Sequence, residues 1–206
     1  CTAVESPSVR DSDAPVPPLR TEIEVRADVP IVEGNHIAAD MITFSRVTRT
    51  QLDDLMAYDV LTGVRRVPGI LISRYNLVGS YGGGEGGTLF IRGMGSGRPG
   101  AEIQILVDGV PRYSGVWAHP LMDVLAVDTM DQIDVVKGAS PVLYGNMSFG
   151  AVDIRTRRML QDGHELELSA AGGPYGTLLT ALNAGYRQGR FDTYVSLGYK
   201  HSDGHR

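Results

Sequence analysis

The chain has 206 residues, of which 42% are hydrophobic and 21% are charged, a composition typical of folded protein rather than of a disordered chain. Its 26 glycines and low aromatic content of 7% favour turns and bulges over long helices, which argues against an all-helical fold. The net charge of -5 and the lack of a basic run argue against nucleic acid as a partner. No apolar stretch approaches the roughly 20 residues of a transmembrane helix, so any membrane crossing would need strands.

Cysteine is used once, at Cys1, which excludes an intrachain disulfide and a cysteine-based metal site. The sequence has no charged segment followed by an apolar one, the pattern of a signal peptide. We therefore expect any signal peptide to have been removed or to lie outside this sequence. Cys1 itself fits two interpretations, the lipid-carrying residue of a processed lipoprotein and an arbitrary boundary of the sequence.

The N-terminal segment divides into an arm and a short strand. Residues 1–20 are rich in Ser, Pro, Asp and Ala, and their prolines block regular structure, so we interpret them as a flexible arm. In residues 21–27, Ile23 and Val25 alternate with charged side chains, as in an extended strand. This segment is a candidate for pairing with the edge of another sheet.

Residues 21–158 have the pattern of a small α+β domain. Thr50 and Asp53 have the spacing that caps the start of a helix, and a second short helix is predicted from Asp59 to the Pro-Gly pair at 68–69. Short apolar runs joined by glycine-rich loops predict strands of a mixed sheet at residues 41–45, 70–73, 88–92, 103–107, 133–136 and 152–156.

From His164 onward the pattern changes to alternation over runs of about ten residues, separated by turns at 172–176 and 188–190. Each run has one apolar and one polar face, as the strands of a membrane β-barrel do. A half-solvated soluble meander has the same alternation, so the pattern by itself leaves both interpretations open. The large apolar side chains on the predicted lipid face are Leu166, Leu168, Leu178, Leu182, Phe191, Val195, Leu197 and Tyr199.

Three motifs occur in order along the first domain. The first is Val67-Pro68-Gly69-Ile70 followed by Phe90-Ile91-Arg92-Gly93, and the second is Ile-Leu-Val-Asp-Gly-Val-Pro at residues 105–111. The third begins at Ile133 with Ile-Asp-Val-Val-Lys-Gly-Ala-Ser-Pro-Val-Leu-Tyr-Gly and continues in Gly-Ala-Val-Asp-Ile at 150–154. In this order and spacing, the motifs resemble the plug domain of TonB-dependent outer-membrane receptors.

The resemblance implies a plug domain over residues 21–158, followed by the opening antiparallel strands of a transmembrane β-barrel over residues 159–206. Single-chain barrels need about eight strands, so we expect the sequence to be part of a longer protein. In the third motif the family usually has arginine and then proline where this chain has Lys137 and Ala139. Lysine keeps the charge but lacks the planar fork that binds a carboxylate bidentately, so an ion pair to the barrel would differ here.

The resemblance also implies a function, which is transport of a scarce nutrient across the outer membrane of a Gram-negative cell. The transported ligand would be an iron chelate (a ferric siderophore or haem) or cobalamin. TonB at the periplasmic face and outer-membrane lipid would be the other partners, with the N-terminus in the periplasm. Residues 21–27 are the candidate TonB box, with Glu22, Ile23, Glu24 and Val25 as contacts. The receptor would carry out no covalent chemistry and would need no cofactor.

Two groups of site residues follow from the resemblance. Charged residues in or beside apolar strands would contact the barrel wall, although a solvated sheet face is the usual explanation for such charges. These wall contacts are Arg92, Asp108, Asp131, Asp134 and Lys137. The apical plug loops would contact the ligand through Tyr81, Glu85, Met94, Arg98, Trp117 and His119. His119 equally fits a turn residue packed beside Trp117.

Other kinds of site have little support in the sequence. The glycine-rich segments 82–87 and 93–97 lack the following helix and the Lys-Ser/Thr pair of a phosphate loop. No catalytic motif argues for an enzyme. His201 and His205 could meet at a metal if they were helical, but an exposed pair without function is the simpler interpretation, so no metal site is predicted. The alternative to a transport receptor is a soluble periplasmic or surface binding module with no transport role.

Overall fold

The computed structural model describes residues 36–37, 42–73, 78, 88–95, 103–112, 125–139, 144 and 149–204. The predicted arm and the candidate TonB box lie outside these residues. No helix in the described part of the chain is long and apolar enough to cross a membrane. The elements of the first domain are β1 (His36–Ile37), β2 (Thr43–Thr48), α1 (Arg49–Asp54), α2 (Val60–Val64), β3 (Ile70–Ser73), β4 (Thr88–Ile91), β5 (Ile103–Val107), β6 (Val110–Pro111), the 3-10 helix η3 (Val127–Thr129), β7 (Met130–Lys137) and β8 (Gly150–Thr156).

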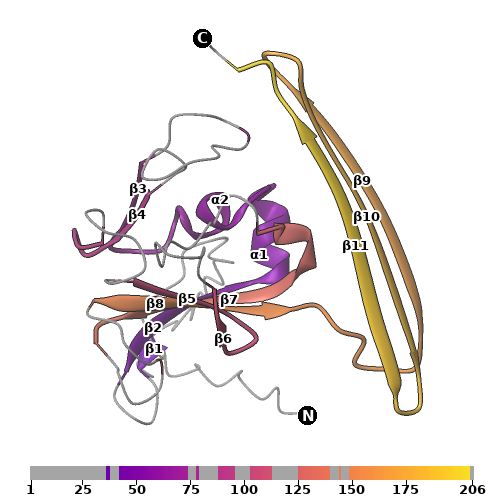
Figure 1. Cartoon of the computed structure of the whole chain (residues 1–206), viewed down its shortest axis with the longest axis horizontal. Helices are drawn as coiled ribbons and strands as arrows, with labels where there is room; N and C mark the ends of the chain where they lie inside the picture. Colours follow the sequence, from indigo (N-terminus) through magenta and orange to yellow (C-terminus); the bar gives the residue numbers. More distant parts are fainter. Residues whose placement is uncertain are drawn as a thin grey trace, which may run out of the picture. The chain divides into compact units, whose positions relative to one another are not determined.

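A six-stranded mixed sheet, in the order β1-β2-β7-β8-β5-β6, is the framework of this domain. Its neighbouring strands are antiparallel except β5 and β8, which are parallel. Helices α1 and α2 lie on one face of the sheet, and β3 and β4 form a separate hairpin (Figure 1). The fold is therefore the α+β domain with a mixed sheet that the sequence predicts. The main core between helices and sheet includes Val47, Leu52, Leu61, Ile105, Ile133 and Ile154.

The two helices form where the sequence predicts them, but the first begins differently. Strand β2 continues to Thr48, whose extended backbone starts α1, and the Thr48 amide donates a hydrogen bond to Gln51 Oε1 at 2.7 Å. The predicted cap at Thr50 is therefore wrong, because Thr50 already lies inside the helix. For α2 the Asp59 carboxylate accepts a hydrogen bond from the Thr62 amide at 2.7 Å, which satisfies a free donor of the first turn.

The strands match the predicted ones with shifts at their ends. The strands at 70–73 and 103–107 coincide with β3 and β5, whereas β7 and β8 begin earlier than predicted because backbone pairing continues beyond the apolar run. Strand β2 is shifted toward the C-terminus relative to the predicted 41–45. Asp108 and Gly109 both have positive φ, 50° and 77°, the conformation of a tight Asp-Gly hairpin turn between β5 and β6.

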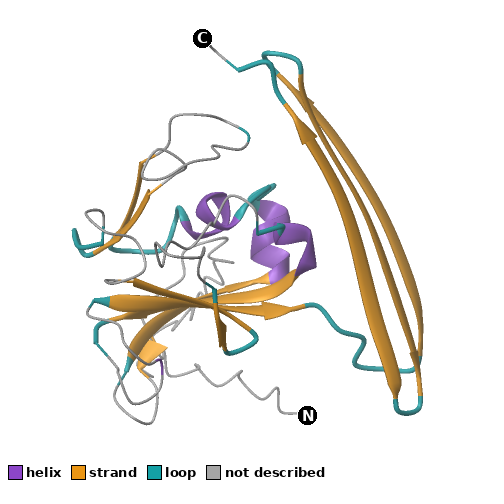
Figure 2. Ribbon diagram, in the orientation of Figure 1, coloured by secondary structure: helices purple, strands orange, loops and turns teal. Residues whose placement is uncertain are grey.

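Three long strands, β9 (Gly163–Gly173), β10 (Thr177–Gln188) and β11 (Phe191–His201), form a second antiparallel sheet with β10 in the middle (Figure 2). The pairing places Leu182 between Leu168 on β9 and Leu197 on β11. Because side chains alternate along each strand, this register gathers the predicted apolar side chains on one face. That face is exposed: Leu168 is 78% accessible and Leu197 is 63% accessible.

The polar face of the same sheet makes the contacts with the first domain. Lys200 on β11 donates a hydrogen bond to the backbone oxygen of Tyr58, and Glu167 on β9 pairs with Arg157 beyond the end of β8. A soluble meander would bury its apolar face against the domain and leave the polar face in water. The observed orientation is the reverse, as expected of strands that face lipid.

Gly150, the first residue of β8, lies at a tightly packed position of the mixed sheet. A Cβ at this position would lie 2.6 Å from the Val136 backbone oxygen and 2.7 Å from Ile91 Cδ1. We expect Gly150→Ala to lower the free energy of unfolding by about 1–3 kcal/mol, the usual range for overpacking. The measurement is denaturant unfolding of the chain in a mild detergent. Gly172→Ala is the matched control, since its Cβ would come no closer than 3.9 Å to Thr177 O, and equal losses for the two variants would contradict the prediction.

Candidate functional site at the junction of the two sheets

Arg157, the first residue after β8, contacts two of the three strands of the second sheet, β9 and β11. Its guanidinium donates to Glu165 at 2.5 Å and to Glu167 at 2.8 Å, two carboxylates on the same face of β9. It also lies over the ring of Tyr194 on β11, 4.8 Å from the ring centroid. Asn183 on β10 donates to Glu167 at 3.4 Å, which brings the middle strand into the network.

Arg157 is held from the side of the first domain as well. Its backbone amide donates to Thr129 O at 2.8 Å, at the end of η3. The side chain is only 14% accessible, whereas the two carboxylates are each more than 40% accessible. The guanidinium therefore occupies a fixed and largely covered position between the two sheets, and its planar fork suits binding to two carboxylates.

The rest of the connection between β8 and β9, residues 158–162, is also hydrogen-bonded to the strands of the second sheet. The Met159 amide donates to Asp192 at 3.1 Å, and Arg187 donates to Met159 O at 2.8 Å. A Cβ on Gly185 would lie 2.6 Å from Met159 Sδ, so the methionine side chain packs directly on the backbone of β10 at this glycine. The Gly189 amide, in the β10–β11 turn, donates to a carboxylate oxygen of Asp162 at 3.1 Å.

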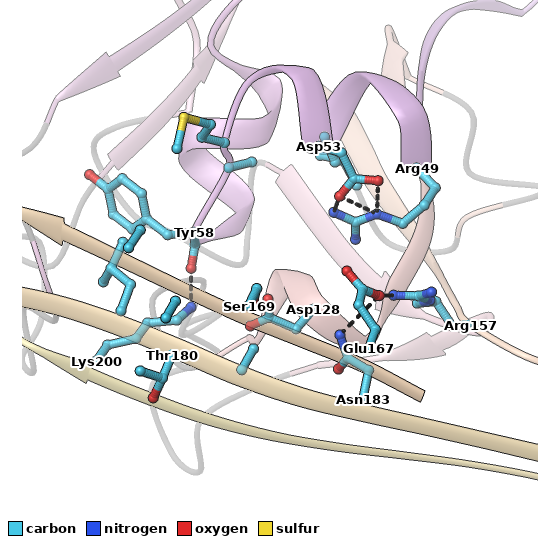
Figure 3. Close-up of a pocket in the computed structure, with 17 residues that line it drawn as sticks. Arg49, Asp53, Tyr58, Asp128, Arg157, Glu167, Ser169, Thr180, Asn183 and Lys200 are labelled. Atoms are coloured by element: carbon cyan, nitrogen blue, oxygen red, sulfur yellow. Dashed lines mark hydrogen bonds and ion pairs between the residues drawn. The ribbon is translucent and has the colours of Figure 1, made fainter. Parts of the chain in front are cut away.

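A cavity of about 320 Å³ lies next to this network, between α1 and the polar face of the strands (Figure 3). Arg49 and Asp53 of α1 pair on its wall, and Arg49 also donates to Val127 O and Met130 O, both at 2.9 Å. Lys200 crosses the other end of the cavity to reach Tyr58 O (Figure 3). The lining combines charged and small apolar side chains. In the described part of the chain no group of three or more His, Cys, Asp or Glu could hold a metal.

Two of the five predicted wall contacts, Asp134 and Lys137, are buried and have partners inside the mixed sheet. Arg46 on β2 binds Asp134 through two hydrogen bonds, at 2.8 and 2.9 Å. Lys137 is buried and donates to Ser45 Oγ at 2.8 Å. Burial and the nearby positive charge of Arg92 lower the pKa of the Lys137 amine.

The other three predicted wall contacts are exposed. The Asp108 carboxylate accepts hydrogen bonds from the Thr156 amide at 2.9 Å and from its hydroxyl at 2.7 Å, which ties the β5–β6 turn to the end of β8. Arg92 lies in the turn after β4 with a φ of 53°, and Asp131 lies near the start of β7. Contacts of these residues with further parts of a barrel stay a prediction.

Of the predicted ligand contacts, only Met94 lies within the described residues. It is 44% accessible and forms an isolated backbone bridge with Ile91. The other five residues, and the four candidate TonB-box residues, lie outside the described part of the chain. His201 ends β11 and contacts Asp203 at 3.2 Å, so the helical spacing considered for His201 and His205 does not apply at His201.

The junction network was not predicted from the sequence, although a signal for it is present. Glu165 and Glu167 are two apart on the polar face of the first predicted barrel strand, and Arg157 and Arg158 follow directly after the last strand of the first domain. In a barrel that encloses a plug, the polar face of a strand has to meet the plug. Charges of opposite sign on either side of this short connection were therefore candidates for pairing.

Asp153 on β8 has an unusual electrostatic position. It lies directly opposite Asp134 in the β7–β8 pairing, and its Oδ1 is buried without a hydrogen-bond partner among the described residues. Burial raises the pKa of Asp153, and the negative charges of Asp134 and Asp108 act in the same direction, while Arg155 and the Gly109 amide oppose the shift. The ionised form of this carboxyl is thus disfavoured in the folded chain.

The chain matches one protein family and has curated relatives. The family described as TonB-dependent Receptor Plug Domain matches residues 39–152, which is more than half of the chain. A curated relative, the vitamin B12 transporter BtuB of Vibrio vulnificus (strain CMCP6), is 26% identical over 142 residues. That alignment covers 67% of this chain but 22% of the relative, so the chain spans about a fifth of the length of that protein.

Solved structures show the same fold at low sequence identity. The pyoverdine-bound receptor FpvA of P. aeruginosa superposes with a TM-score of 0.63 at 16% identity, over 83% of this chain and 23% of FpvA. The ferric yersiniabactin uptake receptor FyuA of Yersinia pestis gives a TM-score of 0.59 at 17% identity, over 78% of this chain and 24% of FyuA. At such identities the likeness concerns the fold.

The raised pKa of Asp153 predicts a pH-dependent effect of its removal. Because the folded chain disfavours the ionised carboxyl, we expect Asp153→Asn to stabilise it at about pH 7. This stabilisation should shrink as the pH falls through the raised pKa of the folded chain toward the ordinary pKa of an aspartate, about 3.9. At low pH the Asp153 carboxyl of the wild type is protonated and neutral, so the two proteins then carry the same charge at this position. The measurement is the difference in melting temperature between variant and wild type across this pH range.

The control for this experiment is Asp131→Asn, which removes the same charge at an exposed position of β7. It separates the effect of burial from a change in net charge. A gain for Asp153→Asn that stays constant with pH, or that the control reproduces, would contradict the prediction.

Proposed function

Because the chain belongs to the family of TonB-dependent receptor plug domains, we propose that it is the N-terminal part of an outer-membrane receptor that imports a scarce nutrient. In this proposal residues 21–158 form a plug that closes a β-barrel, and residues 159–206 begin the barrel wall. The N-terminus lies in the periplasm, and the receptor carries out no covalent chemistry.

The observation that carries the proposal is the orientation of β9–β11. Their apolar face, with side chains such as Leu166 and Leu168 more than 70% accessible, faces away from the contacts with the first domain. An exposed apolar surface of this kind marks a membrane or protein interface. Their polar face meets the domain through ion pairs, as a barrel wall meets an enclosed plug. A soluble binding module offers no reason for this arrangement.

For the transported ligand we propose a metal chelate, and an iron chelate such as a ferric siderophore or haem is the first candidate. The similarity in fold to FpvA, which is bound to pyoverdine in its structure, and to FyuA, a ferric yersiniabactin uptake receptor, supports this class. Cobalamin is the second candidate, because the curated relative BtuB is a vitamin B12 transporter. The six apical residues predicted to contact the ligand, from Tyr81 to His119, belong to this proposal.

The function is tested with the complete gene in its own cell. We expect the full-length protein in the outer-membrane fraction, and we expect deletion of the gene to abolish growth on one source of a panel. The panel contains ferric catecholate and hydroxamate siderophores, haem, and cyanocobalamin, each supplied as the limiting nutrient. Recovery of the protein in the soluble periplasmic fraction would overturn the proposal and favour the binding module.

The partnership with TonB makes a separate prediction at residues 21–27. Proline lacks the backbone N–H that an added strand donates to a sheet edge, so Val25→Pro should abolish uptake of the growth-supporting compound. Binding of that compound to intact cells should be unchanged, because the energy-coupling segment is distant in sequence from the apical loops. The measurement compares binding at low temperature with uptake at growth temperature. Val25→Ala, which keeps the N–H, is the matched control, and loss of binding in the proline variant would move the box elsewhere.

A further inference from the structure

We propose that Arg157 is a positioning residue of the gate, which keeps the helical side of the plug attached to β9–β11 while the path for the ligand opens elsewhere in the barrel. The proposal rests on the proposed transport function and assigns a role to a residue outside the family motifs described above. It follows from the number, direction and burial of the contacts that meet at this residue.

Arg157 joins the two sheets through both its backbone and its side chain. Its backbone is fixed to Thr129 at the end of η3, and its side chain reaches Glu165, Glu167 and the ring of Tyr194. These groups belong to two different strands of the wall, and the Asn183 amide adds the third. Separating plug from wall at this point would break both charge-assisted hydrogen bonds of Arg157 and its contact with the Tyr194 ring together.

The contacts on either side of Arg157 also hold the plug to β9–β11. Met159 exchanges backbone hydrogen bonds with the side chains of Asp192 and Arg187, one on each side of the β10–β11 turn. At the other end of the cavity Lys200 binds Tyr58 O. An opening along β9–β11 would have to break all of these contacts together, which disfavours a path on this side of the plug.

Arg157 differs in its surroundings from the arginine that follows it. Arg158 pairs with Asp192 at 3.6 Å, and its side chain is 73% accessible. Exposed pairs of this kind contribute little, typically about 0–1 kcal/mol. Arg157 and Arg158 thus carry the same charge at adjacent positions, yet only Arg157 is largely covered and bound to two carboxylates. This contrast provides a matched control.

The test uses the full-length receptor in the outer membrane and needs no knowledge of its ligand. Vancomycin is too large to cross an intact outer membrane efficiently, so a plug that leaves the wall should admit it. We expect Arg157→Ala to lower the vancomycin concentration that stops growth by about fourfold or more, because the carboxylates lose their countercharge. Arg158→Ala should behave as wild type. An assembled Arg157→Ala receptor without this sensitivity would overturn the proposal.

A charge exchange separates a specific pairing from a general loss of stability. Arg157→Glu alone places three carboxylates together and should increase the vancomycin sensitivity at least as much as Arg157→Ala does. Combining it with Glu167→Arg restores one positive and two negative charges at the junction, and we expect resistance to return toward the wild-type value. If the double variant is no more resistant than Arg157→Glu, the proposed pairing is wrong.

Assembly is monitored for every variant by its amount in the outer-membrane fraction and by the shift in gel mobility on heating. If Arg157→Ala fails to assemble, Arg157→Lys is used, which keeps the charge but loses the fork and should give an intermediate sensitivity. Wild-type resistance in an assembled Arg157→Lys receptor would then overturn the proposal. Absence of the wild-type protein from the outer membrane would instead overturn the proposed function, so the two failures are distinguishable.

Discussion

The two-residue period of β9–β11 is the constraint on which the arrangement of this protein depends. Because side chains alternate along a strand, a sheet with one apolar face necessarily presents its polar face to whatever lies on the other side. Here the other side is the mixed sheet with its helices. The plug therefore has to offer charged and hydrogen-bonding groups where it meets the wall, and the Arg157 guanidinium and the backbone oxygen of Tyr58 do so.

The same constraint explains why charge is distributed unevenly in the plug. The core between helices and sheet is apolar, and the charge of Asp134 within the mixed sheet is compensated locally by Arg46. At the junction the charges of the plug are instead compensated by the wall.

Much of the fold could be predicted from the sequence because local signals agreed with the final structure. The apolar runs that become β3 and β5, the Asp-Gly turn at 108–109 and the alternation that becomes β9–β11 all depend on neighbouring residues. The cap of α1 was predicted two residues too late, because the end of β2 is set by its pairing with β7 and not by local sequence. Pairing across the sheet likewise extended β7 and β8 beyond their apolar runs.

For the candidate site as well, some features follow from local sequence and others depend on the tertiary structure. The sequence by itself determined which residues alternate, which carry charge and which family the motifs resemble, since these properties belong to short segments. Only the tertiary structure decided that Asp134 pairs with Arg46, that Lys137 binds Ser45, and that Arg157 meets Glu165 and Glu167. The physical reason is that an ion pair depends on the distance between two side chains, and that distance is fixed by strand register and by the packing of one sheet against another.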